Sequence, residues 1–88
     1  MVLFDALGRR WTLRVLWELR EAPLNFRALQ ARCEDISPTS LNSRLKMLRE
    51  MQLVDLNEDG YHLTGQGQEL GEQLVVLNGW ANRWADSL

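Results

Sequence analysis

The sequence has few of the residues that form covalent cross-links or bind metals. It contains one cysteine, Cys33, and one histidine, His62. A single cysteine excludes an internal disulfide, and these two residues are too few for a zinc site built from Cys and His ligands. We therefore expect no metal and no cofactor, and we expect the fold to be held together by packing of apolar side chains.

Long apolar runs are also missing. No stretch approaches the ~20 apolar residues that a membrane helix needs. The apolar segment at residues 2–7 is too short for a signal peptide and is interrupted by Asp5. With 88 residues, 45% hydrophobic and 25% charged, the chain resembles one ordinary globular domain, residues 1–88. We expect it in the cytoplasm, with no membrane partner.

The net charge is −2, which counts against nucleic-acid binding if charge is averaged over the whole surface. The charges are unevenly distributed, however, with cations in the first and middle parts and carboxylates after them. The pattern predicts separate basic and acidic patches. The cations on which this prediction rests are Arg9, Arg10, Arg14, Arg20, Arg44, Lys46 and Arg49, and the carboxylates that follow them are Asp55, Glu58, Asp59, Glu69 and Glu72.

The sequence contains no recognisable set of catalytic residues. His62 follows Tyr61 without a carboxylate or nucleophile at a suggestive spacing. Gly65 and Gly67 lack the neighbours of a phosphate-binding or dinucleotide-binding loop. We therefore expect no enzymatic activity, and we interpret the two glycines as sites of close helix packing.

Two short helices are predicted in the first part of the chain. Apolar residues recur at helical spacing from Trp11 to Arg20, and Pro23 ends this pattern. Asn25 can cap a second helix of about two turns. Because Cys33 lies on the inward stripe of this helix, we interpret it as a core residue rather than a redox sensor. The predicted inward residues are Trp11, Val15, Leu16, Trp17, Leu19, Phe26, Leu29 and Cys33.

The clearest local signal marks the start of a third helix. Ser37 can act as N-cap, Pro38 suits the first helical position, and Ile36 can contact Leu41 across the first turn. This helix is predicted to run to about Met51. Its predicted buried residues are Leu41, Leu45 and Leu48.

The outer face of the third helix carries small polar and basic side chains. A short helix, a tight turn and a well-capped helix form a helix-turn-helix unit. Ser, Thr and Asn can reach base edges in the major groove of double-stranded DNA, and Arg and Lys can pair with guanine or phosphate. The candidate DNA-binding residues are Ser37 (cap and phosphate), Thr39, Ser40, Asn42 and Ser43 (base edges), and Arg44, Lys46 and Arg49 (guanine or phosphate).

The last third of the chain predicts a hairpin and a final helix. Alternating residues flank turn residues at positions 57–60, which is typical of a two-stranded hairpin and a candidate wing. Thr64 can cap the final helix, whose apolar residues repeat in steps of four and three. The predicted fold is mainly α with a small β-hairpin, in the order helix, helix, helix, hairpin, helix. The apolar stripe of the final helix is Leu70, Leu74, Leu77, Ala81, Trp84 and Leu88.

This stripe is longer than one small domain can cover. Residues nearest the hairpin would close the domain's own core. We expect the remainder to pack against a second copy of the chain, together with apolar residues near the N-terminus, so that the protein dimerises through its terminal segments. The predicted dimer-interface residues are Leu3, Phe4, Leu7, Leu77, Trp80, Trp84 and Leu88.

Several segments, in order and over nearly the whole chain, resemble the HxlR-type winged helix-turn-helix regulators, which are relatives of the MarR type. Gly8–Leu13 is similar to that family's Gly-x-Lys-Trp-Thr opening, and Phe26 and Leu29 match its second helix. Further matches are Leu16–Leu19, Ile36, Ser37, Leu41, Arg44, Leu45, Leu48 and Leu53–Val54, and then Leu63, Thr64, Gly67 and Leu70, which follow its Leu-Thr-x-x-Gly-x-x-Leu pattern.

The resemblance implies a homodimeric transcription factor that places the helix from Pro38 in the major groove of DNA and its hairpin near the minor groove. The hairpin is shorter than is usual in that family, and its tip, residues 57–60, is acidic, so we assign no DNA contact to it. Pro38 replaces a polar residue common in relatives. The alternative is a protein-binding module with the same fold. A small-molecule effector is compatible with the regulator, but the sequence does not identify one.

Overall fold

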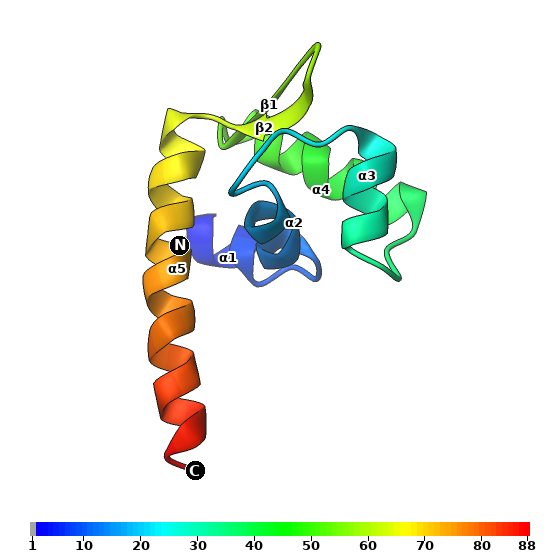
Figure 1. Cartoon of the computed structure of the whole chain (residues 1–88). Coiled ribbons are helices and arrows are strands. Elements are labelled where there is room, and N and C mark those ends of the chain that lie inside the picture. Colours follow the sequence, from blue (N-terminus) through cyan, green and yellow to red (C-terminus); the bar gives the residue numbers. More distant parts are fainter. Residues whose placement is uncertain (1) are drawn as a thin grey trace.

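The computed structural model describes residues 2–88, which form five helices and one hairpin (Figure 1). The predicted fold class, mainly helical with a two-stranded antiparallel hairpin, is confirmed. The elements in chain order are α1 (Val2–Leu7), α2 (Thr12–Glu18), α3 (Phe26–Arg32), α4 (Pro38–Glu50), β1 (Val54–Asn57), β2 (Gly60–Leu63) and α5 (Gly65–Asp86).

The start of the chain differs from the predicted order. The helix α1 was not predicted, and it packs on α2 with Ala6 buried and with Leu3 and Leu7 half-buried against the core. The predicted first helix, residues 11–20, is shortened to α2. Trp11 lies at its N-cap with φ 76° and no side-chain cap, so the chain turns sharply there instead of continuing as helix.

The three later helices begin where the sequence predicts. Asn25, Ser37 and Thr64 each accept a hydrogen bond from the backbone N–H three residues further on, at 2.8, 3.1 and 3.1 Å. These bonds satisfy donors that a helix N-terminus otherwise leaves without partners. The predicted cap of α4 positions the start of the proposed recognition helix.

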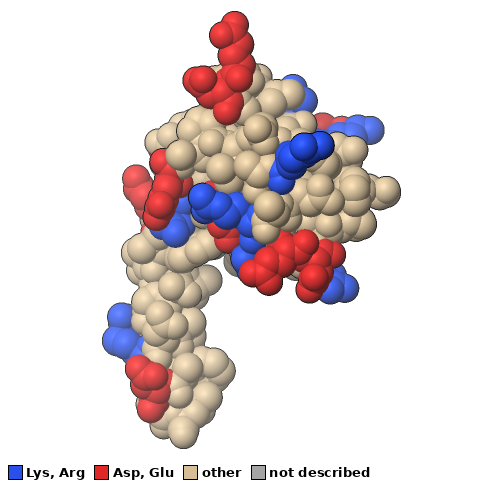
Figure 2. Space-filling view, turned by 45° about the vertical axis from the view of Figure 1, so that its right-hand side comes forward, with Lys and Arg blue, Asp and Glu red and all other residues tan. Residues whose placement is uncertain are grey.

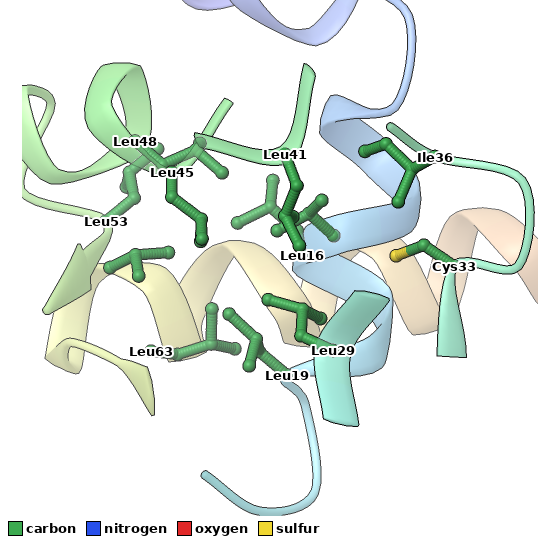
Figure 3. Packing of buried hydrophobic residues seen from close by; sticks show 12 residues of the cluster. Leu16, Leu19, Leu29, Cys33, Ile36, Leu41, Leu45, Leu48, Leu53 and Leu63 are labelled. Atoms are coloured by element: carbon green, nitrogen blue, oxygen red, sulfur yellow. The ribbon is translucent and has the colours of Figure 1, made fainter. Parts of the chain in front are cut away.

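The core lies where α2, α3, α4 and the hairpin meet (Figure 3). The three leucines predicted to face inward from α4 are all buried, which confirms the predicted orientation of that helix. Cys33 is also completely buried, as predicted. The buried cluster is Val15, Leu16, Leu19, Leu29, Cys33, Ile36, Leu41, Leu45, Leu48, Leu53, Val54 and Leu63.

The hairpin is fastened to the loop between α2 and α3. Leu24 and Tyr61 exchange two backbone hydrogen bonds, of 3.0 and 2.8 Å, in an antiparallel bridge. Gly60 is buried with φ 116°, and a Cβ there would lie 2.6 Å from the carbonyl carbon and oxygen of Leu24. Only glycine tolerates this conformation together with this approach, so the hairpin has a fixed position beside the helix-turn-helix.

One of the two predicted packing glycines is confirmed. A Cβ on Gly67 would overlap the backbone carbonyl of Leu53, so the absence of a side chain allows α5 to approach the hairpin closely. A Cβ on Gly65 would meet no atom. The prediction for Gly65 was wrong because this residue lies at the exposed first position of α5.

The second half of α5 extends away from the rest of the chain (Figure 1). Leu70 and Leu74 pack against the core, but the large apolar residues beyond them lie on the surface. None of the helices in residues 2–88 combines the length and the apolar character needed to cross a membrane. The exposed large apolar residues beyond Leu74 are Val75, Val76, Leu77, Trp80 and Trp84 of α5, and Leu88, which follows the helix.

Candidate nucleic-acid interface

The structure places the predicted DNA-binding residues at the start of α4 and on its surface outside the buried leucine stripe. With its leucine stripe buried, the opposite surface of the helix is free of other elements. Such an exposed helix, with small polar residues near its N-terminus, has the dimensions and chemistry that fit a DNA major groove. Ser37, Thr39, Asn42, Ser43, Lys46 and Arg49 are exposed, and Ser40 and Arg44 are half-buried.

The cations of α4 differ from the arginines earlier in the chain. Arg14 is ion-paired with Glu18 at 2.7 Å, and this hydrogen bond raises the pKa of Arg14 above its ordinary value. Arg20 lies over the ring of Trp17, 3.8 Å from its centroid, and is near a carboxylate of Glu21 at 3.7 Å. These arginines are therefore engaged in the fold, and they do not make the first part of the chain a free basic patch.

By contrast, no ion pair to another residue of 2–88 is formed by the cations of α4. The single hydrogen bond of this group joins Arg44 to Ser43, 3.5 Å apart. Lys46 and Arg49 are exposed. Cations without an internal partner can bind phosphate without first breaking an ion pair.

A groove of about 490 Å³ separates α4 from the hairpin. Asn42, Lys46 and Arg49, spaced four and three residues apart on α4, line one side. Residues of the α4–β1 turn and the hairpin line the other side, and Tyr61 is the aromatic residue among them. The predicted DNA-facing helix thus shares a groove with the hairpin rather than standing alone.

The hairpin tip is acidic, as predicted. Figure 2 shows acidic side chains at the top of the molecule, where Figure 1 places the turn between β1 and β2. Asn57 accepts a hydrogen bond from the N–H of Asp59 at 2.8 Å, which holds Glu58 and Asp59 in an exposed turn. Two adjacent carboxylates repel phosphate, so this tip is unsuited to contact the DNA backbone.

Sequence reasoning missed the contribution of Gln52, Tyr61 and Thr64 to this groove. All three line it together with α4. Tyr61 follows a turn and belongs to a segment in which apolar and polar residues alternate. This pattern predicts a strand, but it does not predict that the strand lies beside α4. The bridge to Leu24 determines that placement, and a single residue in a loop carries no signal for such a pairing.

The predicted dimer-interface residues occupy both ends of the chain. Phe4, Leu77, Trp80, Trp84 and Leu88 are exposed, and the rings of the two tryptophans stack with centroids 6.0 Å apart and planes 6° apart. Leu3 and Leu7 differ from these, because they are half-buried against the core of their own chain.

A second groove, of about 620 Å³, lies between α2 and α5. Its apolar lining comes from Leu13 and Trp17 on α2 and from Leu74 and Leu77 on α5. Trp11 packs against the core as predicted. Trp17 is only half-buried, is not among the residues that pack against the core, and lines this groove, so its interpretation as a core anchor was wrong.

Cys33 lies in the core behind α3. Burial raises the pKa of its thiol above the ordinary value, and a protonated thiol is a poor nucleophile. Within residues 2–88 no group of three or more His, Cys, Asp or Glu side chains is arranged to hold a metal ion.

The family model of the HxlR-like helix-turn-helix matches residues 6–88. The chain belongs to the HxlR family. This agrees with the resemblance seen in the sequence and covers the helix-turn-helix, the hairpin and α5. Members of the HxlR family are transcriptional regulators and not enzymes.

Individual relatives of this HxlR-family chain support the assignment. It is 25% identical over 91 residues to an uncharacterized HTH-type transcriptional regulator, MJ0925, of Methanocaldococcus jannaschii, covering 99% of this chain and 86% of that protein. It is 27% identical over 89 residues to the uncharacterized HTH-type transcriptional regulator YvaP of Bacillus subtilis, covering 93% and 82%. Both alignments span most of the relative, so the similarity is not confined to the helix-turn-helix.

Solved structures show the same fold. The quinone-bound YodB of B. subtilis superposes with a TM-score of 0.86 at 28% identity, covering 93% of each chain. A possible HxlR family transcriptional factor of Thermoplasma volcanium superposes with a TM-score of 0.83 at 24% identity, covering 96% of this chain and 82% of the other. The winged-helix fold predicted from the sequence is thus confirmed.

Proposed function

We propose that this HxlR-family protein is a sequence-specific regulator of transcription that binds double-stranded DNA as a homodimer in the cytoplasm. The observation that carries the proposal is the orientation of α4. Its leucines are buried, most of its polar and basic side chains are exposed, and its cations form no ion pair with another residue of 2–88. In a family of helix-turn-helix regulators, this face is the one suited to the major groove.

The proposed contacts divide by chemistry. Thr39, Ser40, Asn42 and Ser43 lie in the first half of α4 and read base edges. Arg44, Lys46 and Arg49 bind guanine or phosphate, and Ser37 adds a phosphate contact at the capped helix start. The acidic hairpin tip is left out of the interface.

The homodimer is supported by the surface of α5. Trp80 and Trp84 are each more than half exposed, and with Leu77 and Leu88 they form a continuous apolar stripe. An apolar surface of this kind on a small protein favours association. A two-fold pairing through α5 would set the two α4 helices on one side of the dimer, about one DNA turn or ~34 Å apart.

The salt dependence of binding to duplex DNA tests the DNA-binding proposal. If three α4 cations from each subunit bind phosphates, log K falls with log salt at a slope of about −5. Replacing Lys46 with Gln should reduce the slope by about two for the dimer, one for each lost contact. A folded protein without measurable affinity for duplex DNA at low salt would contradict the proposal and favour the protein-binding alternative.

We further propose a small-molecule effector for the groove between α2 and α5. YodB, a structural relative, was solved with bound quinone. The groove offers the half-buried ring of Trp17 and an apolar lining, which suit a flat organic molecule. Binding beside Trp17 would quench its fluorescence, whereas a Trp17→Phe variant would lose that part of the signal.

A further inference from the structure

We infer that the hydroxyl of Tyr61 donates a hydrogen bond to a phosphate of the DNA strand that runs along the groove between α4 and the hairpin. This inference rests on the proposed DNA binding by α4. It makes Tyr61 a positioning residue that fixes how deeply and at what angle α4 enters the major groove.

The position of the groove determines which part of the DNA it meets. Asn42, Lys46 and Arg49 line it from α4. When a helix lies in the major groove, the sugar-phosphate strands border it on each side. Tyr61 belongs to the hairpin side of the groove, which lies beside α4 and not at its N-terminal end. This side therefore faces a sugar-phosphate strand of the DNA and not the base edges.

The Tyr61 side chain is held in place before any ligand arrives. Its backbone is fixed by the two hydrogen bonds to Leu24, and its ring packs against the core. Its hydroxyl forms no hydrogen bond with another residue of 2–88 and is not among the buried polar atoms that lack a partner, so it is accessible from outside, on a residue that lines the groove. A preorganised donor loses little conformational entropy when it binds.

The other neutral donors of the hairpin wall are less suitable. The Thr64 hydroxyl donates its hydrogen to the carbonyl oxygen of Gln52 at 2.6 Å, so it has no hydrogen left for a phosphate. The Gln52 side chain is exposed and must lose rotational freedom to bind. Tyr61 is therefore the donor that this wall presents in a fixed position.

The charges around the groove explain why a neutral donor is useful there. Lys46 and Arg49 are matched by the carboxylates of Glu50 and Asp55, which also line the groove. These carboxylates offset part of the attraction between the two cations and a phosphate. A hydrogen bond from a phenol adds affinity and direction without adding charge.

The test compares wild type with Tyr61→Phe on the duplex recovered by selection from random sequences and on a scrambled duplex. Each hydrogen bond to a charged oxygen contributes about tenfold to affinity, so losing one from each subunit of the dimer weakens binding by about 100-fold. The loss is expected on both duplexes alike, with an unchanged salt slope, because a phosphate contact carries no sequence information and the hydroxyl carries no charge. His62→Gln, on the same strand but facing Leu19 and Arg20, is the matched control and should bind as wild type does.

Ethylation interference gives a second readout on the same complexes. Ethylation of one phosphate in each half-site should weaken binding of wild type but should no longer weaken binding of Tyr61→Phe. Equal affinities with identical interference patterns would overturn the inference while leaving the proposed function intact. A loss confined to the selected duplex would also overturn it, because it would indicate base readout. Failure of wild type to bind any duplex would instead reject the proposed function itself.

Discussion

Leu24 and Tyr61 join the loop before the helix-turn-helix to the hairpin through two backbone hydrogen bonds, of 3.0 and 2.8 Å. The bridge extends the two-stranded sheet by one residue of a distant segment. It sets the hairpin wall at a fixed distance from α4, and therefore fixes the width of the groove in which Lys46 and Arg49 lie.

Replacing Gly60 with Ala should break this junction. The residue has φ 116°, and the added Cβ would lie 2.6 Å from the backbone of Leu24, which cannot move aside cheaply. We expect a loss of at least about 2 kcal/mol in the free energy of unfolding. The check is denaturant unfolding with Gly65→Ala as control, because that Cβ meets no atom. Equal stabilities of the two variants would show that the bridge does not depend on Gly60.

Replacing Ser37 with Ala should loosen the start of α4. The Ser37 hydroxyl oxygen accepts from the N–H of Ser40 at 3.1 Å, and removing such a cap costs about 1 kcal/mol. Ser43→Ala is the matched control, because Ser43 is exposed inside the same helix and alanine favours helix there. In thermal unfolding, the melting temperature of Ser37→Ala should be several degrees below that of Ser43→Ala. A Ser37→Ala variant as stable as Ser43→Ala would contradict the capping role.

The sequence predicted the elements that local chemistry determines. Ser37 and Pro38 marked the start of α4, and Thr64 marked the start of α5, because a cap depends only on residues a few positions away. The short helix α1 could not be recognised, since six residues form too little of a periodic pattern and packing on α2 decides their conformation.

The candidate site was predictable only in part. The exposed face of α4 followed from its leucine stripe. The opposite wall of the groove did not, because Tyr61 is placed there by the non-local bridge to Leu24. The hydrogen bonds of Arg14 could not be predicted either, because they also depend on a segment distant in sequence. Its guanidinium donates to the carbonyl oxygen of Arg32 on α3, at 2.7 Å.

Replacing Trp84 with Glu should produce a monomer. Trp84 is 52% exposed and stacks on Trp80, and a carboxylate in an apolar interface costs several kcal/mol unless it is paired. Asn82→Glu adds the same charge on the opposite side of α5 and should remain dimeric. Sedimentation at micromolar concentration distinguishes the two. If both variants had the mass of wild type, the dimer would have to form through another surface.

Cys33 should react slowly in the folded protein. Burial raises the pKa of its thiol, so less thiolate is present at a given pH than in the unfolded chain, and the sulfur is also shielded. We expect the rate with a chromogenic disulfide reagent to be at least about tenfold lower in native protein than in denaturant at the same pH. Equal rates in the two states would contradict the structural role and reopen a role as a sensor.

The most important expectation is that α4 reads duplex DNA in a two-fold dimer. It is tested most directly by selecting random duplexes on the purified protein at about 0.1 M salt, a concentration at which nonspecific phosphate contacts are weakened, while its mass is measured under the same conditions. We expect a dimer and an enriched palindrome whose half-sites are centred about one helical turn apart. A folded dimer that enriches no sequence would contradict it.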